Sequence, residues 1–256
     1  MRLIIAAVYK ELIYKKRYLA NTIISMVMFC AIFIALITGY SAISGQGSLF
    51  NYGESTGALI VSYYAWTMML SVFTSTGYIV TVNKQSGILE NIMCNTPHFV
   101  VLLICESLVS SFVYFIFSWL IIGVLTWICN ATIHILILDV FIVLMIGLLS
   151  VLGFSLLVAG SALVLRKTEG IMSILQFVLL GALFLPDSYL TRLFSPFFTA
   201  NQMLTEIFIN GTRVSSFQLM DYLMLFGSSA VYIVIGVFVF SLCMRKAKQK
   251  GNLSFY

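Results

Sequence analysis

The chain has 256 residues, of which 61% are hydrophobic and 9% charged, with a mean hydropathy of +1.06 and a formal net charge of +5. A water-soluble domain carries about 25% charged residues, so this composition excludes a soluble enzyme, a nucleic-acid-binding protein and a disordered chain. The class that remains is a membrane protein that crosses the bilayer several times.

Six long runs without Asp, Glu, Lys or Arg predict the membrane spans. They cover residues 18–53, 55–83, 107–138, 140–165, 170–186 and 222–244. A spanning helix needs about 20 apolar residues, with about 17 as the lower limit, and in lipid its backbone must satisfy its own hydrogen bonds. We therefore predict an all-α integral membrane fold, a single transmembrane domain over residues 1–256. Its spans are expected at about 19–39, 58–81, 99–128, 135–165, 170–186 and 222–244.

The distribution of Lys and Arg predicts how the chain is oriented. If the N-terminus is cytoplasmic, 12 of the 14 basic residues fall on inner segments, and only Arg192 and Arg213 lie outside. Because basic residues are retained on the cytoplasmic side, we expect both termini in the cytoplasm of a multi-pass plasma-membrane protein, of bacterial origin. No cleavable signal peptide is expected, since the basic stretch 15–17 lies too far into the chain.

Motifs for chemistry on the chain itself are absent. The sequence contains no GxxxxGK[ST], HExxH or CxxC pattern, so it predicts no nucleotide, metal or catalytic site, and we do not expect an enzyme. The five cysteines match no metal-site spacing. Only Cys129 lies near the predicted outer surface, so no external disulfide pair is expected and the cysteines are interpreted as small apolar residues.

Between the second and third spans, residues 83–98 carry a short amphipathic pattern. Thr96-Pro97 is typical of a helix cap followed by the first residue of the next helix. A short cytoplasmic helix with Lys84 and Glu90 available to a partner suits a docking element, and a plain amphipathic connector is the alternative. Its apolar residues follow helical spacing: Ile88, Leu89, Ile92 and Met93.

This stretch resembles the first cytoplasmic loop of type-2 ABC exporter permeases, the transmembrane subunits of ATP-binding-cassette exporters. The family loop reads roughly basic-x-x-Gly-Thr-Leu-Glu-x-Leu-x-x-Thr-Pro. This chain departs from it at Ile88, where Thr is common, and at Asn83-Lys84, where an acidic–basic pair is usual. The residues in register are Gly87, Leu89, Glu90, Thr96 and Pro97. The resemblance implies an ATPase-coupling helix formed by Gly87, Ile88, Leu89, Glu90, Ile92 and Met93.

Other segments resemble the same family in order along the chain. Residues 2–17 form a basic, partly apolar stretch similar to an interfacial helix ahead of the first span. Two proline-bearing segments, around Pro186 and Pro196, resemble the pair that folds back into the outer leaflet as short re-entrant helices. Residues 199–209 are expected to form a further short amphipathic helix.

Small polar residues share one face in each of the second and third spans. In membrane helices such stripes are most often packing faces, and lining of a substrate path is the alternative. The possible path-lining residues are Thr67, Ser71, Thr74, Tyr78, Ser107, Ser111 and Tyr114. The glycines of the fourth and sixth spans are interpreted as close-packing positions: Gly147, Gly153, Gly160, Gly227 and Gly236.

The resemblance thus implies a permease that moves an amphipathic substrate (a drug, peptide antibiotic or lipid-linked molecule) out of the cell. It would pair with a second permease, identical or paralogous, on two separate ATPase subunits that hold ATP and Mg. This chain would carry no cofactor and bind no nucleic acid. The alternative function is an autonomous secondary transporter or channel, which predicts charges near the bilayer midplane or inverted repeats. The sequence shows neither feature.

Overall fold

The computed structural model describes residues 5, 8–9, 13, 16–17, 19–44, 54–96, 99–164, 169–183 and 185–249. Within these ranges the regular elements are helices and there is no strand. The elements are α2 (Leu19–Ser44), α3 (Glu54–Phe73), the π-helix η1 (Thr74–Tyr78), α4 (Ile79–Gln85), α5 (Ile88–Asn95), α6 (Phe99–Cys129), α7 (Ile137–Val164), α8 (Glu169–Ala182), α9 (Tyr189–Phe194), α10 (Phe198–Asn210), the 3₁₀-helix η2 (Val214–Ser216) and α11 (Leu219–Gln249).

Four of the helices in this part of the chain are long and apolar enough to cross a membrane. They are Gly57–Gln85, which joins α3, η1 and α4, and then α6, α7 and α11. They indicate a membrane protein and confirm the all-helical prediction. The predicted first and fifth spans coincide with α2 and α8, which contribute shorter apolar stretches, Ile23–Leu36 and Met172–Ala182. The count of six spans stays a prediction.

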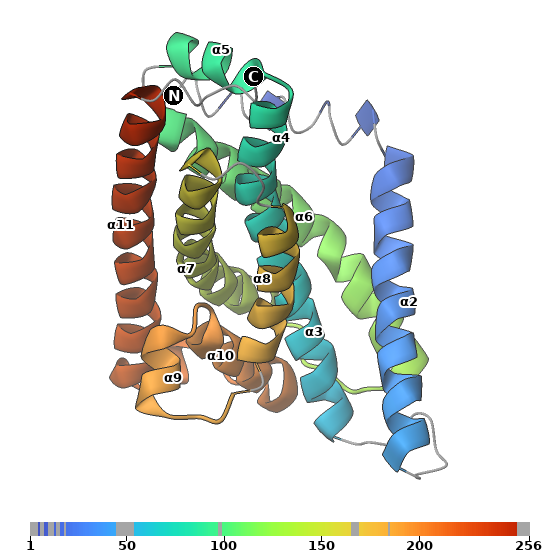
Figure 1. Cartoon of the computed structure of the whole chain (residues 1–256). Coiled ribbons are helices and arrows are strands. Elements are labelled where there is room, and N and C mark those ends of the chain that lie inside the picture. Colours follow the sequence, from blue (N-terminus) through green and yellow to red (C-terminus); the bar gives the residue numbers. More distant parts are fainter. Residues whose placement is uncertain are drawn as a thin grey trace.

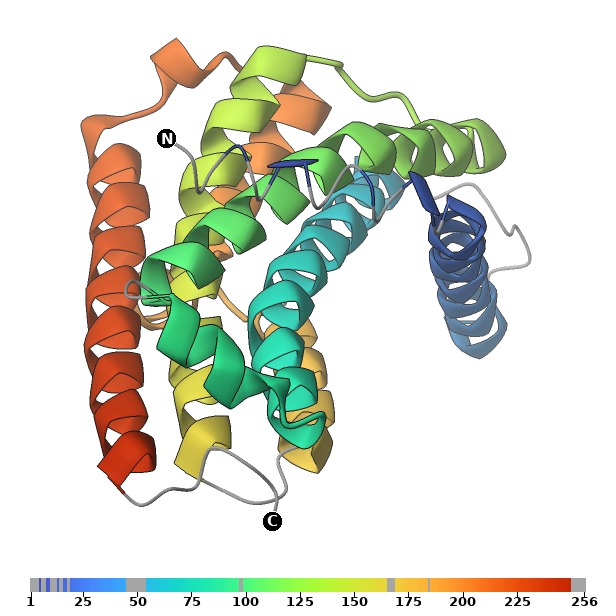
Figure 2. The same ribbon diagram turned by 90° about the horizontal axis from the view of Figure 1, so that it is seen from above.

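The long helices run between two ends of the bundle, and α7 and α11 run in the same direction (Figure 1). One end, called here the α5 end, carries α5 together with the last turns of α4, α7 and α11. The other, the α10 end, carries α9, α10 and the connection between α6 and α7. The helix α2 stands apart from the other long helices in both views (Figures 1 and 2). It contacts α3 through Phe33, whose ring centroid lies 4.8 Å from that of Tyr63, and through the Tyr63 hydroxyl, which donates to Phe29 O. It also packs against α6.

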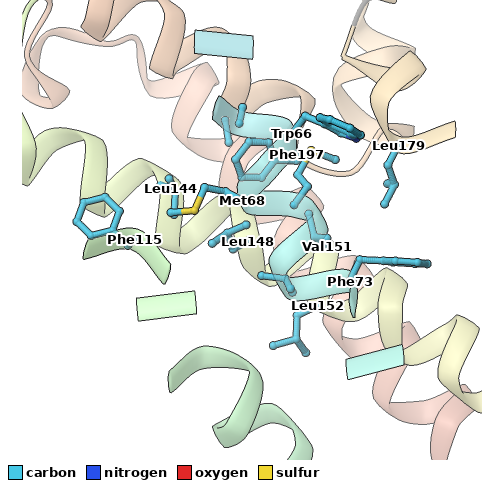
Figure 3. Close-up of a cluster of buried hydrophobic side chains, with 14 of the residues drawn as sticks. Trp66, Met68, Phe73, Phe115, Leu144, Leu148, Val151, Leu152, Leu179 and Phe197 are labelled. Atoms are coloured by element: carbon cyan, nitrogen blue, oxygen red, sulfur yellow. The ribbon is translucent and has the colours of Figure 1, made fainter. Parts of the chain in front are cut away.

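The apolar core lies around α7, which packs between α3 and α11. Figure 3 shows Met68 and Phe73 of α3 beside Leu144, Leu148 and Leu152 of α7. All five side chains are buried. Such a helix, apolar around most of its circumference, is expected when neighbours cover it on several sides. The position of α7 fixes where the other long helices can lie.

Helices α7 and α11 approach each other so closely that only glycine fits at their crossing. A Cβ on Gly236 would lie 2.2 Å from Gly153 O, and one on Gly153 would lie 2.3 Å from Tyr232 O. Small residues allow this backbone approach in membrane helices. The close-packing interpretation is therefore confirmed for Gly153 and Gly236. It is wrong for Gly227 within the described part of the chain, because nothing lies within 4 Å of a Cβ there.

Candidate functional site

The short helix α5 lies across the α5 end of the bundle and turns away from α4 at Gly87 (Figure 1). Gly87 has φ of 68°, a left-handed conformation that glycine adopts without the steric penalty of a Cβ. No atom lies within 4 Å of where a Cβ would be, so the requirement is conformational. The helix ends where the Thr96 N–H donates to Ile92 O. Pro97, which completes the family motif, lies outside the described residues.

The inner face of α5 belongs to the core of its own chain. Leu89 is completely buried and Met93 is 3% exposed. Their spacing of four residues places both on one helix face, and an amphipathic helix at the end of a bundle turns its apolar face inward. The coupling-helix prediction included these two side chains. Here they anchor α5 to the bundle and leave any docking to the opposite face.

The outer face of α5 is accessible and chemically mixed. Ile88 is 50% exposed, and Glu90, Asn91 and Asn95 are exposed as well. Asn95 Nδ2 donates to Asn91 Oδ1 at 2.6 Å, which orders the amides along this face. Glu90 occupies the first turn, where the helix dipole favours a negative charge. The face therefore offers one apolar side chain, one carboxylate and two amides to a partner.

Lys84 points into the protein and not toward a partner. Its side chain is 5% exposed, and Nζ donates to Ala162 O and Leu163 O at 2.9 and 3.0 Å. These carbonyls belong to the last turn of α7, whose oxygens have no partner inside the helix. The expectation that Lys84 is available to a partner is wrong. The residue ties the end of α4, one turn before α5, to the end of α7.

Three of the predicted path-lining residues are buried in the bundle. Thr67, Ser107 and Ser111 are each about 1% exposed. Ser107 Oγ accepts from Thr76 Oγ1 at 3.0 Å and lies 3.1 Å from Ser75 Oγ, which joins η1 to α6. The bonds of Ser107 are typical of a packing face, and lining of a path stays a prediction for Thr67, Ser107 and Ser111.

The other members of the stripe lie nearer the surface. Thr74 is exposed, while Ser71 and Tyr114 are half-buried. Thr74 opens the π-helix η1, and its hydroxyl donates to Leu70 O. Such π-helical insertions are found frequently at functional sites. The side chain of Tyr78 lies outside the described residues. Lining of a path stays a prediction for Ser71, Thr74, Tyr78 and Tyr114.

The two proline-bearing segments lie at the α10 end. Pro186 is exposed and precedes α9, whose capping residue Ser188 and Thr191 bond each other reciprocally. Pro196 is buried in the turn into α10. Phe197 and Ala200 then pack against Gly147 of α7. The chain that leaves α8 thus returns to the bundle as two short helices, α9 and α10. That this segment folds back into the outer leaflet stays a prediction.

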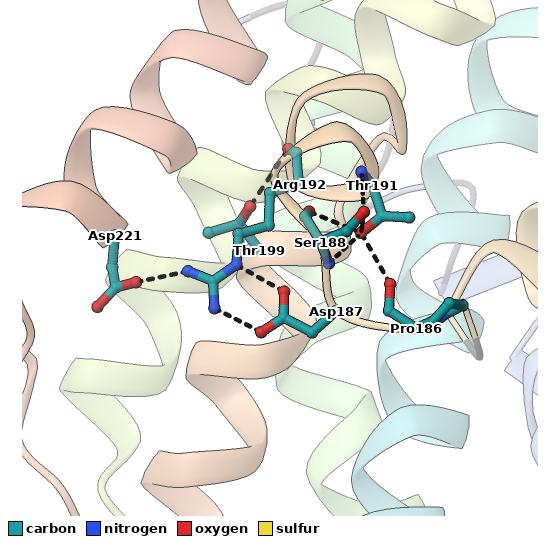
Figure 4. A network of polar contacts seen from close by, with 7 residues as sticks. All are labelled: Pro186, Asp187, Ser188, Thr191, Arg192, Thr199 and Asp221. Atoms are coloured by element: carbon teal, nitrogen blue, oxygen red, sulfur yellow. Dashed lines mark hydrogen bonds and ion pairs between the residues drawn. The ribbon is translucent and has the colours of Figure 1, made fainter.

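The most extensive ionic contact found among the described residues was not anticipated from the sequence. Arg192 Nε and Nη2 donate to the two carboxylate oxygens of Asp187 at 2.7 Å each, and Nη1 donates to Asp221 Oδ1 at 2.9 Å (Figure 4). The contact links α9 to the first turn of α11. In the sequence, Asp187 and Asp221 only mark the ends of charge-free runs. Arg192 is used only as one of the two basic residues predicted to lie outside the cell. No pattern pairs residues 29 positions apart.

We expect the Arg192 contact to stabilise the fold in a pH-dependent way. The hydrogen bonds from Arg192 hold the pKa of Asp187 below its usual range. A carboxyl with a lowered pKa stabilises the fold fully above its ordinary pKa of about 3.9, and this stabilisation is lost as the pH falls through the lowered pKa. Asp187 is 47% exposed, so Asp187→Asn should reduce the unfolding free energy by only about 0.2–1 kcal/mol at pH 7.

Detergent-solubilised wild type and Asp187→Asn, unfolded by denaturant at pH 7 and at successively lower pH, test this expectation. The difference in unfolding free energy should shrink as the pH falls below about 4. A difference that stays constant with pH would contradict an ionic origin.

Comparisons with known protein families, with curated proteins and with solved structures find no match to the chain.

Proposed function

We propose that the chain is the transmembrane permease subunit of an ATP-driven exporter that moves an amphipathic substrate out of the cell. It pairs with a second permease, identical or paralogous, and docks on two separate ATPase subunits, which bind ATP and Mg and carry out hydrolysis. The substrate class is a drug, a peptide antibiotic or a lipid-linked molecule, because the helices offer an apolar and weakly charged surface.

The observation that carries the proposal is the placement of α5. It is a short amphipathic helix across one end of a bundle of long apolar helices, anchored by Leu89 and Met93 and open at Ile88 and Glu90. This is the geometry that a docking element needs. The sequence around this helix also matches the coupling-helix motif at Gly87, Leu89 and Glu90.

The charges at the two ends support a cytoplasmic position for α5. The α5 end carries Lys84 and, on the last turns of α11, Arg245, Lys246 and Lys248. The α10 end carries Arg192 and Arg213. Because basic residues accumulate on the cytoplasmic side, α5 faces the cytoplasm in this proposal, where ATPase subunits reside. The α9–α10 segment then faces outward.

The contacts of α5 supply a route by which ATPase movement reaches the membrane helices. Leu89 and Met93 join α5 to the core, and Lys84 bonds the end of α7 from the turn just before it. Coupling between sites is carried by such chains of packed and hydrogen-bonded groups. A displacement of α5 would therefore act on both α4 and α7.

Labelling of single cysteines in a cysteine-free background tests the orientation. We expect a membrane-impermeant thiol reagent to label Arg213→Cys in intact cells and to label Lys248→Cys only after permeabilisation. These positions lie at opposite ends of the structure and each serves as the control for the other. Labelling of Lys248→Cys from outside would overturn the proposed orientation.

A further inference from the structure

The second half of α11 has one face that the rest of the described chain leaves uncovered. The opposite face packs against α7 and includes the buried Gly236 and Phe240. The uncovered side chains recur at intervals of one, three and four residues, so they form one stripe along the helix. All are apolar and between 40% and 65% exposed: Val231, Val234, Ile235, Phe238 and Leu242. In a membrane protein such a stripe meets the acyl chains of lipids.

The stripe ends in two basic residues. Arg245 and Lys246 follow Leu242 by three and four residues, so they continue the same face of the helix. Both are exposed, and neither forms an ion pair with another described residue. The sequence holds no Asp or Glu after Asp221, so this half of the helix supplies no counter-ion of its own. The face therefore offers two positive charges to an anion from outside the chain.

The position of these charges along α11 matches the headgroup region of a bilayer. The charge-free run 222–244 is about 35 Å long at a rise of about 1.5 Å per residue, and the hydrocarbon core is about 30 Å thick. With this run inside the core, Asp221 lies at one interface and Arg245 at the other, at the α5 end (Figure 1). Arg245 and Lys246 are then at the depth of lipid phosphates, directly beyond the apolar stripe.

We propose that this face binds an anionic phospholipid, with its acyl chains along residues 234–242 and its phosphate between Arg245 and Lys246. A guanidinium presents paired N–H donors to phosphate oxygens, and the ammonium adds a second charge. Basic groups next to a spanning helix attract anionic headgroups in this way. A soluble phosphate would leave the apolar stripe unused, and a zwitterionic lipid brings its own cation. The negatively charged lipid matches both parts of the face.

Native mass spectrometry of the purified full chain in mild detergent, titrated with one probe at a time, tests the proposal. It needs no ATPase, so it succeeds or fails independently of the exporter assignment. The probes are dioleoyl-phosphatidylglycerol, which is anionic, dioleoyl-phosphatidylcholine, which has the same chains, and glycerol 3-phosphate, which has none. We expect saturable binding of phosphatidylglycerol, with a Kd about tenfold or more below that of phosphatidylcholine. Glycerol 3-phosphate should not bind at the same concentrations. Equal Kd values for the two lipids would overturn the proposal.

Lys246→Gln and Lys248→Gln are a matched pair that removes the same side chain at two exposed positions. Lys248 follows Leu242 by six residues, which places it about 120° away around the helix. Lys246→Gln should raise the Kd for phosphatidylglycerol about fivefold, and its combination with Arg245→Gln about 30-fold. Lys248→Gln should leave the Kd unchanged. Equal effects of the two single variants would mean a diffuse attraction of charge and would overturn the site.

Phe238→Ala tests the contact with the acyl chains. Phe238 is 63% exposed on the stripe, so its truncation should preserve the fold, which circular dichroism checks. The Kd values of the two lipids should rise by the same factor, because the chains are identical and the two charges remain. Wild-type Kd values for both lipids would show that the chains lie elsewhere and would contradict the proposal.

An acidic surface of a protein partner is the competing occupant of the two charges. It predicts that the variant combining Arg245→Gln with Lys246→Gln binds phosphatidylglycerol as the wild type does, while the protein partner no longer co-purifies. That result would overturn the lipid site. A raised Kd for phosphatidylglycerol in the isolated chain, with the Kd for phosphatidylcholine unchanged, supports it.

Discussion

Changing Ile88 to Asp and Glu90 to Lys together should weaken association with the ATPase subunit about 100-fold or more. Ile88 is half exposed, so docking would bury the other half and contribute about 1 kcal/mol. A charge-assisted hydrogen bond from Glu90 contributes about 1.5–3 kcal/mol when shielded from water. Together these come to about 2.5–4 kcal/mol, and about 2.8 kcal/mol corresponds to 100-fold. Both side chains point away from the core, so the membrane fold should survive.

Leu89→Ala is the matched control because Leu89 neighbours both positions but points inward. It should destabilise the permease by about 2–5 kcal/mol, as is typical when a buried Leu is truncated. Association is measured as the ATP-hydrolysing activity that co-purifies with the affinity-tagged chain. Folding is measured by detergent size-exclusion chromatography of the chain alone. A well-folded double variant that retains the ATPase at the wild-type level would show that α5 is only a connector.

The crossing of α7 and α11 should be the least tolerant point of the fold. Gly153→Ala or Gly236→Ala each places a Cβ within 2.3 Å of backbone atoms of the other helix. Backbone cannot rotate away as a side chain can, so the helices must separate. Overpacking typically costs about 1–3 kcal/mol, and we expect about 3 kcal/mol or more here, with loss of folded protein after detergent extraction.

Gly227→Ala is the control in the same helix. Its Cβ meets nothing within 4 Å, and alanine in a helix is favoured over glycine by about 0.5–1 kcal/mol. The variant should therefore be as stable as wild type or slightly more stable. Unfolding in denaturant, followed by helicity, compares the three variants. Equal stability of Gly153→Ala and Gly227→Ala would contradict the close crossing.

Composition and spacing were sufficient to locate most of the long helices. The predicted spans 99–128 and 135–165 coincide with Phe99–Cys129 and Ile137–Val164 to within two residues. Their ends are set by the length of apolar sequence that lipid requires. The last helix, Leu219–Gln249, extends beyond the predicted span because a helix continues into water as long as its backbone bonds persist. Spacing also located α5, since its apolar residues recur at helical intervals.

The direction in which single side chains point could not be predicted in this way. The motif gives Leu89 and Glu90 equal weight, yet the bundle buries one and exposes the other. The sequence predicts that Lys84 is available to a partner, but the end of α7 lies within reach of its ammonium. The bonds of Arg192 to Asp187 and Asp221 depend on how α9 lies against α11. These are consequences of tertiary packing, which no local pattern in the sequence encodes.

Native mass spectrometry of the chain, purified in mild detergent from its own host under ATP-free conditions, tests the central claim most directly. The account predicts a four-subunit complex of two permeases, each this chain or a paralogue, and two copies of a separate ATP-hydrolysing subunit, which dissociates when Ile88→Asp and Glu90→Lys are combined. A chain that purifies without any ATP-hydrolysing subunit, and that transports a substrate in proteoliposomes lacking ATP, would contradict it.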